Sequence, residues 1–171
     1  IQILKKEKID YLFIPKFKDI FSFKCQNKVF LSNFSNKLCG KFRTGHFKGV
    51  LEVVSRFLEI IKPKYIYLGV KDFQQLVLIS EHIKKRRLKT KVISCKTIRE
   101  KNGLAISSRN KLLKTNEKKI AIKTINFLKN RKKKIVLKDI NSITNRLLNF
   151  GVTKIDYIKI MDIKKLKYEN K

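Results

Sequence analysis

The sequence feature that most constrains the fold is a strand–helix–strand pattern between residues 65 and 95. Residues 65–68 form a compact apolar run, residues 73–87 carry apolar side chains at helical spacing, and residues 91–95 return to an extended pattern. Strands joined in this way form a parallel pair with a right-handed crossover, and ligands gather where such strands end. The pattern predicts an α/β domain with a candidate site just after Leu68.

Further elements are predicted on both sides of this unit. Pro63 ends a helix in which apolar residues recur every three or four positions, and Thr115 is a plausible N-cap of a later helix. The part of the chain after residue 95 has the pattern of a second, smaller α+β region. The predicted elements are strands over 10–15, 29–31 and 155–160, and helices over 45–61, 115–130 and 137–150.

Composition excludes several classes of protein. With 43% hydrophobic residues in 171, the chain is too apolar to be disordered, and no apolar run approaches the length of a membrane span. No secretion signal opens the sequence, which favours a cytoplasmic location. The cysteines (25, 39 and 95) are odd in number and form no CxxC pair, which argues against a disulfide framework or a zinc site.

The net charge of +30 has two interpretations. Basic clusters at 84–87 and 131–134 are typical of a nucleic-acid binder. The chain is also rich in Ile, Asn, Phe and Lys throughout, a bias that codon composition alone would produce. No RRM, KH or zinc-finger signature accompanies the charge, so we expect nonspecific binding of nucleic acid at low salt.

The segment from Gly69 to Gln75 is the first candidate for chemistry, because it lies where the strand should pass into the helix. Gly69 would let a ligand approach the backbone, and Lys71 could neutralise phosphate or carboxylate oxygens at the helix start. Asp72 could cap the helix or receive a hydroxyl, and Gln75 shares its helical face. The alternative is a capped, solvated helix start without a ligand.

Two further clusters carry polar side chains that suit anion binding. In the first, Ser107, Ser108 and Arg109 follow a short apolar stretch and could recognise phosphate. In the second, Arg43 and His46 begin the 45–61 helix, where a histidine could transfer protons or bind a carboxylate. Each cluster alone is equally compatible with a polar surface loop, and the sequence has neither a Walker A nor a GxGxxG motif.

In this order and at this spacing, the clusters closely resemble the pantothenate synthetase family of pantoate–β-alanine ligases. From about Asp10 to Met161 the chain can be laid along the family without large gaps. The matching blocks are LCG at 38–40, GHFKGV at 45–50, GVKDFQQL at 69–76, TIRE at 97–100, GLA at 103–105 and SSRN at 107–110.

The resemblance implies a fold, a reaction and partners. Residues 1–97 are expected to form the C-terminal part of a Rossmann-like domain of the nucleotidyltransferase superfamily, incomplete at its N-terminus, and residues 98–171 a small α+β lid domain. The implied reaction is the ATP- and Mg²⁺-dependent condensation of pantoate with β-alanine through pantoyl adenylate, in a homodimer.

The resemblance also assigns roles to single residues. Gln75 matches a pantoate-binding glutamine, while Arg43 and His46 match positions at the edge of the pocket. The residues implied as catalytic, facing the phosphates, are Lys71, Ser107, Ser108 and Arg109. The residues implied to contact ATP are Gly69, Val70, Lys71, Asp72, Ile98, Ile106, Ser107, Ser108 and Arg109.

The sequence departs from the family at several points. Val70 replaces a usual acidic residue, while Thr44 and Lys96 replace common prolines. The family's N-terminal nucleotide-binding signature with its paired catalytic histidines, its first pantoate-binding glutamine and its usual C-terminal strand have no counterpart here. We therefore expect a fragment truncated at both ends. Whether this fragment is active by itself is an open question.

Three alternatives stay open. The chain could be a different adenylate-forming enzyme of the same superfamily, or a noncatalytic basic binding module or decayed protein that retains the fold. It could also be complemented in trans by a separately encoded segment.

Overall fold

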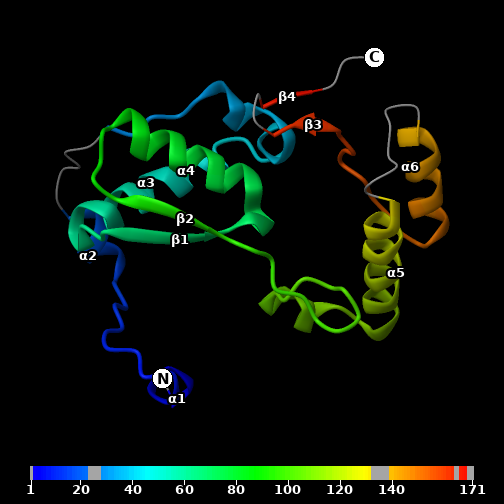
Figure 1. The fold of residues 1–171 in the computed structure, drawn as a ribbon, viewed down its shortest axis with the longest axis horizontal. Helices are drawn as coiled ribbons and strands as arrows, with labels where there is room; N and C mark the ends of the chain where they lie inside the picture. The colour runs from blue at the N-terminus through cyan, green and yellow to red at the C-terminus, as the bar shows by residue number, and fades with distance from the viewer. Residues whose placement is uncertain (1, 23–27, 132–138, 164–165, 169–171) are drawn as a thin grey trace.

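The computed structural model describes residues 2–22, 28–131, 139–163 and 166–168 (Figure 1). Within these ranges no helix is both long and apolar enough to cross a membrane. The α-helices are α1 (Gln2–Lys6), α2 (Phe17–Phe21), α3 (His46–Ile61), α4 (Phe73–Lys85), α5 (Thr115–Arg131) and α6 (Ile140–Asn149). The strands are β1 (Tyr65–Gly69), β2 (Lys91–Cys95), β3 (Met161–Asp162) and β4 (Lys167–Tyr168). Short 3₁₀ helices are η1 (Asn33–Asn36), η2 (Leu38–Phe42), η3 (Val70–Asp72) and η4 (Ser108–Leu112).

The predicted strand–helix–strand unit is confirmed. β1 and β2 pair in parallel, from Tyr65 opposite Lys91 to Gly69 opposite Cys95, and α4 connects them. Helix α3 precedes β1 and packs against α4, so both helices cover one face of the sheet (Figure 1). This arrangement brings the start of α3, the end of β1 and the start of α4 together.

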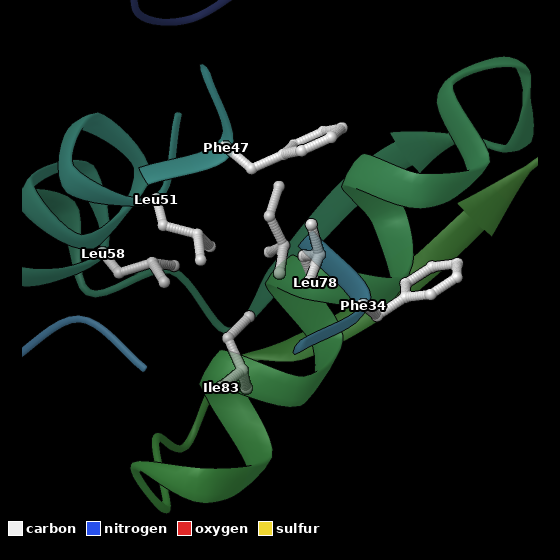
Figure 2. Close-up of a cluster of buried hydrophobic side chains, with 7 residues drawn as sticks. Phe34, Phe47, Leu51, Leu58, Leu78 and Ile83 are labelled. Atoms are coloured by element: carbon white, nitrogen blue, oxygen red, sulfur yellow. The ribbon is translucent and has the colours of Figure 1, made fainter. Parts of the chain in front are cut away.

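The core lies between these two helices and the strands (Figure 2). Leu51 of α3 and Leu78 of α4 are fully enclosed, and Ile66, Leu68 and Val92 of the sheet pack against the cluster. The buried members of the cluster are Phe34, Phe47, Leu51, Leu58, Leu78, Ile79 and Ile83. Because strand side chains alternate between faces, Tyr67 stands on the opposite side of β1 and is 66% exposed.

Three predicted strands are wrong. Residues 10–15 and 29–31 have no regular structure, and residues 155–160 are irregular up to β3, which begins at Met161. Among the described residues, the apolar run at 10–15 has no neighbouring strand with which to exchange hydrogen bonds, and Tyr11 is 92% exposed. An apolar pattern alone therefore does not make a strand.

The predicted N-cap at Thr115 is also wrong by one position. Thr115 is the first residue of α5, and the amide of Lys114 donates to the Glu117 carboxylate at 2.7 Å. A glutamate that accepts from a backbone amide three residues earlier is the second half of a capping box, which places the cap at Lys114. The predicted helix over 137–150 is described from residue 139 onward, and its first two residues lie outside the described ranges.

Helices α5 and α6 stand apart from the sheet, and the C-terminal segment then returns to η2 (Figure 1). Phe127 of α5 and Phe150, just after α6, meet edge to face at 5.4 Å between ring centroids. Met161 and Leu166 pack against the core cluster between α3, α4 and the sheet. The domain division at residue 97 stays a prediction, while the return of residues 152–163 gives the last part of the chain access to the candidate site.

Candidate active site

A cavity of about 180 Å³ lies where β1 ends, at the position expected for a ligand in a parallel sheet. Arg43 and His46 approach it from the start of α3, Lys71 and Asp72 from η3, and Gln75 from the first turn of α4. These five residues were singled out from the sequence, and they line one space. The complete lining is Leu38, Cys39, Arg43, His46, Phe47, Lys71, Asp72, Phe73, Gln74, Gln75 and Tyr157.

The backbone between β1 and α4 turns through η3, which directs successive side chains to the cavity. Gly69 ends β1, and a Cβ atom there would meet no atom within 4 Å, so the space beside this residue is open. The Asp72 side chain makes no capping hydrogen bond at the start of α4, which excludes the capping role considered for it. Lys71 and Asp72 are both exposed to solvent, so the cavity mouth carries one cation and one carboxylate side by side.

Gln74 fixes one wall of the cavity, a role that the sequence did not reveal. Its Nε2 donates to the carbonyl oxygens of Phe34 and Lys37, both at 2.7 Å, and the side chain is 5% exposed. Two carbonyl acceptors on one amide group identify its nitrogen and orient the side chain. Gln74 thereby ties η1 and the start of η2 to α4. The only sequence signal was its place beside Gln75, and neighbouring helix positions face different directions.

The same wall depends on a close backbone approach at Gly40. A Cβ atom on this residue would lie 1.6 Å from the Ser35 carbonyl oxygen, so only glycine fits. Gly40 is buried within η2, between Cys39, which lines the cavity, and the chain leading to Arg43. The LCG block at 38–40 therefore contributes both to packing, through Gly40, and to the cavity lining, through Cys39.

Tyr157 completes the lining from the C-terminal segment. Its hydroxyl lies 2.9 Å from the Cys39 sulfur, and its ring stacks on Phe42 with 5.9 Å between centroids. The sequence predicted residues 155–160 only as a strand, and no local pattern indicated that this tyrosine would meet η2.

The second group of predicted residues lies outside the cavity lining. Ile98 and Ile106 are 68% and 57% exposed, and their backbones pair through the Ile106 amide and the Ile98 carbonyl at 3.0 Å. Gly103, at φ +92°, makes the turn between them. Ser107 caps η4 by accepting from the Arg109 amide at 3.3 Å, and Ser108 and Arg109 are exposed.

Glu100 holds this loop against α5. Its carboxylate accepts a hydrogen bond from Asn102 at 2.9 Å and lies 3.4 Å from the Lys118 ammonium of α5. The hydrogen bond from Asn102, followed by the contact with Lys118, lowers the pKa of Glu100 below its ordinary value. Asn110 connects the next turn by donating to the Ala105 carbonyl at 3.0 Å. Contacts with α5 therefore help to position the loop that carries the two serines.

In the described part of the chain, no three His, Cys, Asp or Glu side chains stand close enough together to hold a metal ion. Among the described residues that line the cavity, Asp72 is the one carboxylate. The site therefore combines two cationic side chains, a histidine, a carboxylate and two carboxamides, a set suited to binding an anionic substrate.

Comparison with known proteins decides the family. Residues 1–171 match the family described as pantoate–β-alanine ligase. The chain belongs to this family. The pantothenate synthetase of Pseudothermotoga lettingae is 34% identical over 170 residues, which are 96% of this chain and 60% of that protein. The pantothenate synthetase of Sulfurihydrogenibium sp. is 41% identical over 120 residues, which are 70% of this chain and 43% of its own length. The matched part of the chain thus spans less than two thirds of these relatives.

Solved ligase structures share the fold. The pantoate–β-alanine ligase of Francisella tularensis, crystallised in complex with beta-gamma ATP and β-alanine, is 37% identical and superposes with a TM-score of 0.81. The match covers 94% of this chain and 60% of that one. The pantothenate synthetase of Thermus thermophilus is 26% identical, with a TM-score of 0.85 over 98% of this chain and 63% of its own. The predicted nucleotidyltransferase-like α/β fold is thus confirmed.

Proposed function

We propose that this chain carries the ATP- and pantoate-binding part of a ligase that makes pantothenate. In the first step a pantoate carboxylate oxygen attacks the α-phosphorus of ATP and displaces pyrophosphate. In the second, the amine of β-alanine attacks the acyl carbon of pantoyl adenylate, loses a proton and displaces AMP. The observation that carries the proposal is the convergence of Arg43, His46, Lys71, Asp72 and Gln75 on one cavity in a chain of this family.

Charge and position suggest how these side chains divide the work. Lys71 follows the open end of β1 directly, where it would neutralise negative charge that develops on the phosphates. Gln75 is half-buried one turn further along, where its carboxamide can pair with the hydroxyl or carboxylate of pantoate. Arg43 and His46 are exposed at the opposite edge and would attract the carboxylate of an incoming acid.

ATP is proposed to reach beyond the cavity to the loop that is held on α5. The proposed contacts there are Ile98, Ile106, Ser107, Ser108 and Arg109, in addition to Gly69–Asp72. Hydroxyls and a guanidinium suit the triphosphate, and the two exposed isoleucines suit the base or the ribose. In this proposal ATP contacts both parts of the chain, and neither part alone could make all of its contacts with ATP.

Mg²⁺ would accompany the phosphates. The ion usually keeps several waters and takes one or two carboxylates together with substrate phosphate oxygens, and Asp72 supplies one carboxylate in the lining. The residues present therefore fit a magnesium ion bound chiefly by ATP. Its contribution would be to neutralise phosphate charge.

Pantoate-dependent exchange of pyrophosphate into ATP is the direct test. Exchange is measured with this chain, and the F. tularensis ligase serves as the positive control. Lys71→Ala should lower exchange by about 100-fold or more, the loss typical when a group that stabilises transition-state charge is removed. Lys64→Ala, which removes the same charge at the other end of β1, should leave the rate unchanged.

Calorimetry with pantoate and with ATP separates binding from turnover. Gln75→Ala should weaken pantoate by roughly 10-fold and leave ATP unaffected, since a buried ligand group would lose its partner. Exchange supported better by another acid, or equal losses in the two lysine variants, would contradict the proposal.

The remaining expectations also belong to this proposal. The enzyme would act in the cytoplasm as a homodimer, and its net charge of +30 would attract nucleic acid only nonspecifically. The comparisons do not favour a noncatalytic nucleic-acid-binding module.

A further inference from the structure

A tyrosine from near the C-terminal end reaches the cavity that holds Lys71 and Gln75. Among the described residues that line this cavity, Tyr157 is the one that follows Gln75 in the sequence. It lies 118 residues after Cys39, its hydrogen-bond partner across the wall, in the irregular segment that leads to β3. The cavity is therefore closed by a part of the chain whose position only the tertiary fold decides.

Tyr157 is held at both ends of its side chain. The hydroxyl lies 2.9 Å from the Cys39 sulfur, and either atom can donate the hydrogen. The ring stacks on Phe42 at an interplanar angle of 17°. Both partners belong to η2, which is itself fixed by the Gln74 hydrogen bond to the Lys37 carbonyl. The contact therefore joins the C-terminal segment to a rigid wall.

The contact also separates two spaces. Tyr157 and Leu38 line the cavity of about 180 Å³ and also a neighbouring cavity of about 550 Å³. The second cavity is bordered by the lysines of residues 37, 41 and 159, so it is basic and more polar. Because Tyr157 lines both spaces, we expect that removal of its ring would join them. On the other side, Met161 and Leu166 anchor the segment to the core.

We propose that Tyr157 is a positioning residue that sets the size of the acid-substrate site and couples pantoate binding to docking of residues 152–163. The inference rests on the proposed function, because it takes the cavity beside Gln75 as the pantoate site. A fixed wall holds a small acid against Gln75 and Lys71, whereas a merged cavity would leave it loosely placed and hydrated. ATP has no proposed contact on η2 or on residues 152–163, so its affinity should not depend on this wall.

Calorimetric titration of pantoate and of ATP into the 171-residue chain tests the selectivity of this effect. Tyr157→Phe keeps the ring and removes the hydroxyl, so pantoate should bind roughly 2- to 10-fold more weakly, the range for one lost hydrogen bond. Tyr157→Ala also removes the stacked ring and should weaken pantoate by more than about 10-fold. Tyr11→Ala, at a tyrosine that is 92% exposed, is the matched control. ATP affinity should be the same in all four proteins, whereas a purely structural loss would weaken both ligands.

Reactivity of Cys39 gives a second measurement that does not depend on the identity of the substrate. Alkylation by iodoacetamide is followed by peptide mass spectrometry, with the half-buried Cys95 as the internal reference. Tyr157→Ala should raise the Cys39 rate by about 10-fold or more relative to Cys95, because the thiol loses its cover. Pantoate should slow alkylation of Cys39 in the wild type.

The outcomes separate the two claims. Pantoate affinity that is unchanged in both Tyr157 variants, or equal loss of pantoate and ATP, overturns the positioning role and leaves the proposed function intact. If the wild type binds no pantoate, the proposed function fails, and the wall is then judged by alkylation: an unchanged Cys39 rate in Tyr157→Ala overturns it, and a raised rate supports it.

Discussion

Protonation of His82 is expected to destabilise this fold below about pH 6.5. The side chain, on α4, is completely buried. Its Nδ1 accepts from the Phe30 amide at 3.1 Å, so the neutral ring carries its hydrogen on Nε2 and donates it to Ser55 Oγ at 2.8 Å. Burial, aided by the charge of Arg86, lowers the pKa of His82 from its ordinary value of 6.5. A second proton would replace the acceptor facing Phe30 with a donor.

The direction of the effect follows from the lowered pKa. The unfolded chain takes up a proton on this residue near pH 6.5, whereas the folded chain does so only at lower pH. Stability is therefore complete above the unfolded pKa and is lost as pH falls toward the folded one. For one proton the loss approaches about 1.4 kcal/mol per pH unit in that window. A chain of this size would lose roughly 2–4 °C in melting temperature for each kcal/mol.

Urea unfolding from about pH 8 to about pH 5.5, in the wild type and in His82→Gln, measures this slope. A glutamine side chain can accept from the Phe30 amide and donate to Ser55, but it does not titrate. The wild type should lose stability relative to the variant below about pH 6.5. Both proteins carry the exposed His46, so any contribution from it to the pH profile drops out of the difference. Parallel pH profiles of the two proteins would refute the reasoning.

Three substitutions test the packing around the site, each read as a change in the free energy of unfolding in urea. Gln74→Leu should cost about 1–3 kcal/mol, since it removes two hydrogen bonds worth roughly 0.5–1.5 kcal/mol each, and Gln75→Leu should cost clearly less; equal losses would contradict the wall assigned to Gln74. Gly40→Ala should destabilise by about 3 kcal/mol, whereas Gly49→Ala, in open space on α3, should stabilise by roughly 0.5–1 kcal/mol; the same sign for both would count against the close approach. Leu51→Ala, in the centre of the core, should cost about 2–5 kcal/mol, and a loss below that range would show that the cluster is loosely packed.

Local periodicity was sufficient to predict the central strand–helix–strand unit and the part of the site that directly follows β1. Apolar residues at helical spacing gave α3 and α4, and a compact apolar run gave β1, since these patterns reflect which face of each element meets the core. Lys71, Asp72 and Gln75 follow β1 directly in the chain, so their meeting at its end required only the strand-to-helix turn. Arg43 and His46 joined them because α3 packs beside α4.

Other features were decided only when distant segments met. The run at 10–15 has the composition of a strand, but no strand in the described part of the chain pairs with it, and a strand depends on hydrogen bonds to a neighbour that the sequence pattern does not supply. Gln74 and Gln75 are chemically identical and both line the cavity, and only the fold shows that Gln74 is buried and bonded to the carbonyls of Phe34 and Lys37.

The sequence by itself determined the α/β class, the order of the central elements and the identity of the polar side chains at the end of β1, because each of these depends on residues near one another in the chain. The tertiary structure decided that His82 is buried between Phe30 and Ser55, and that Tyr157 closes the cavity against Cys39. Such contacts form only when packed elements bring residues that are distant in the sequence close together. The type of one side chain does not indicate which distant residue it will contact.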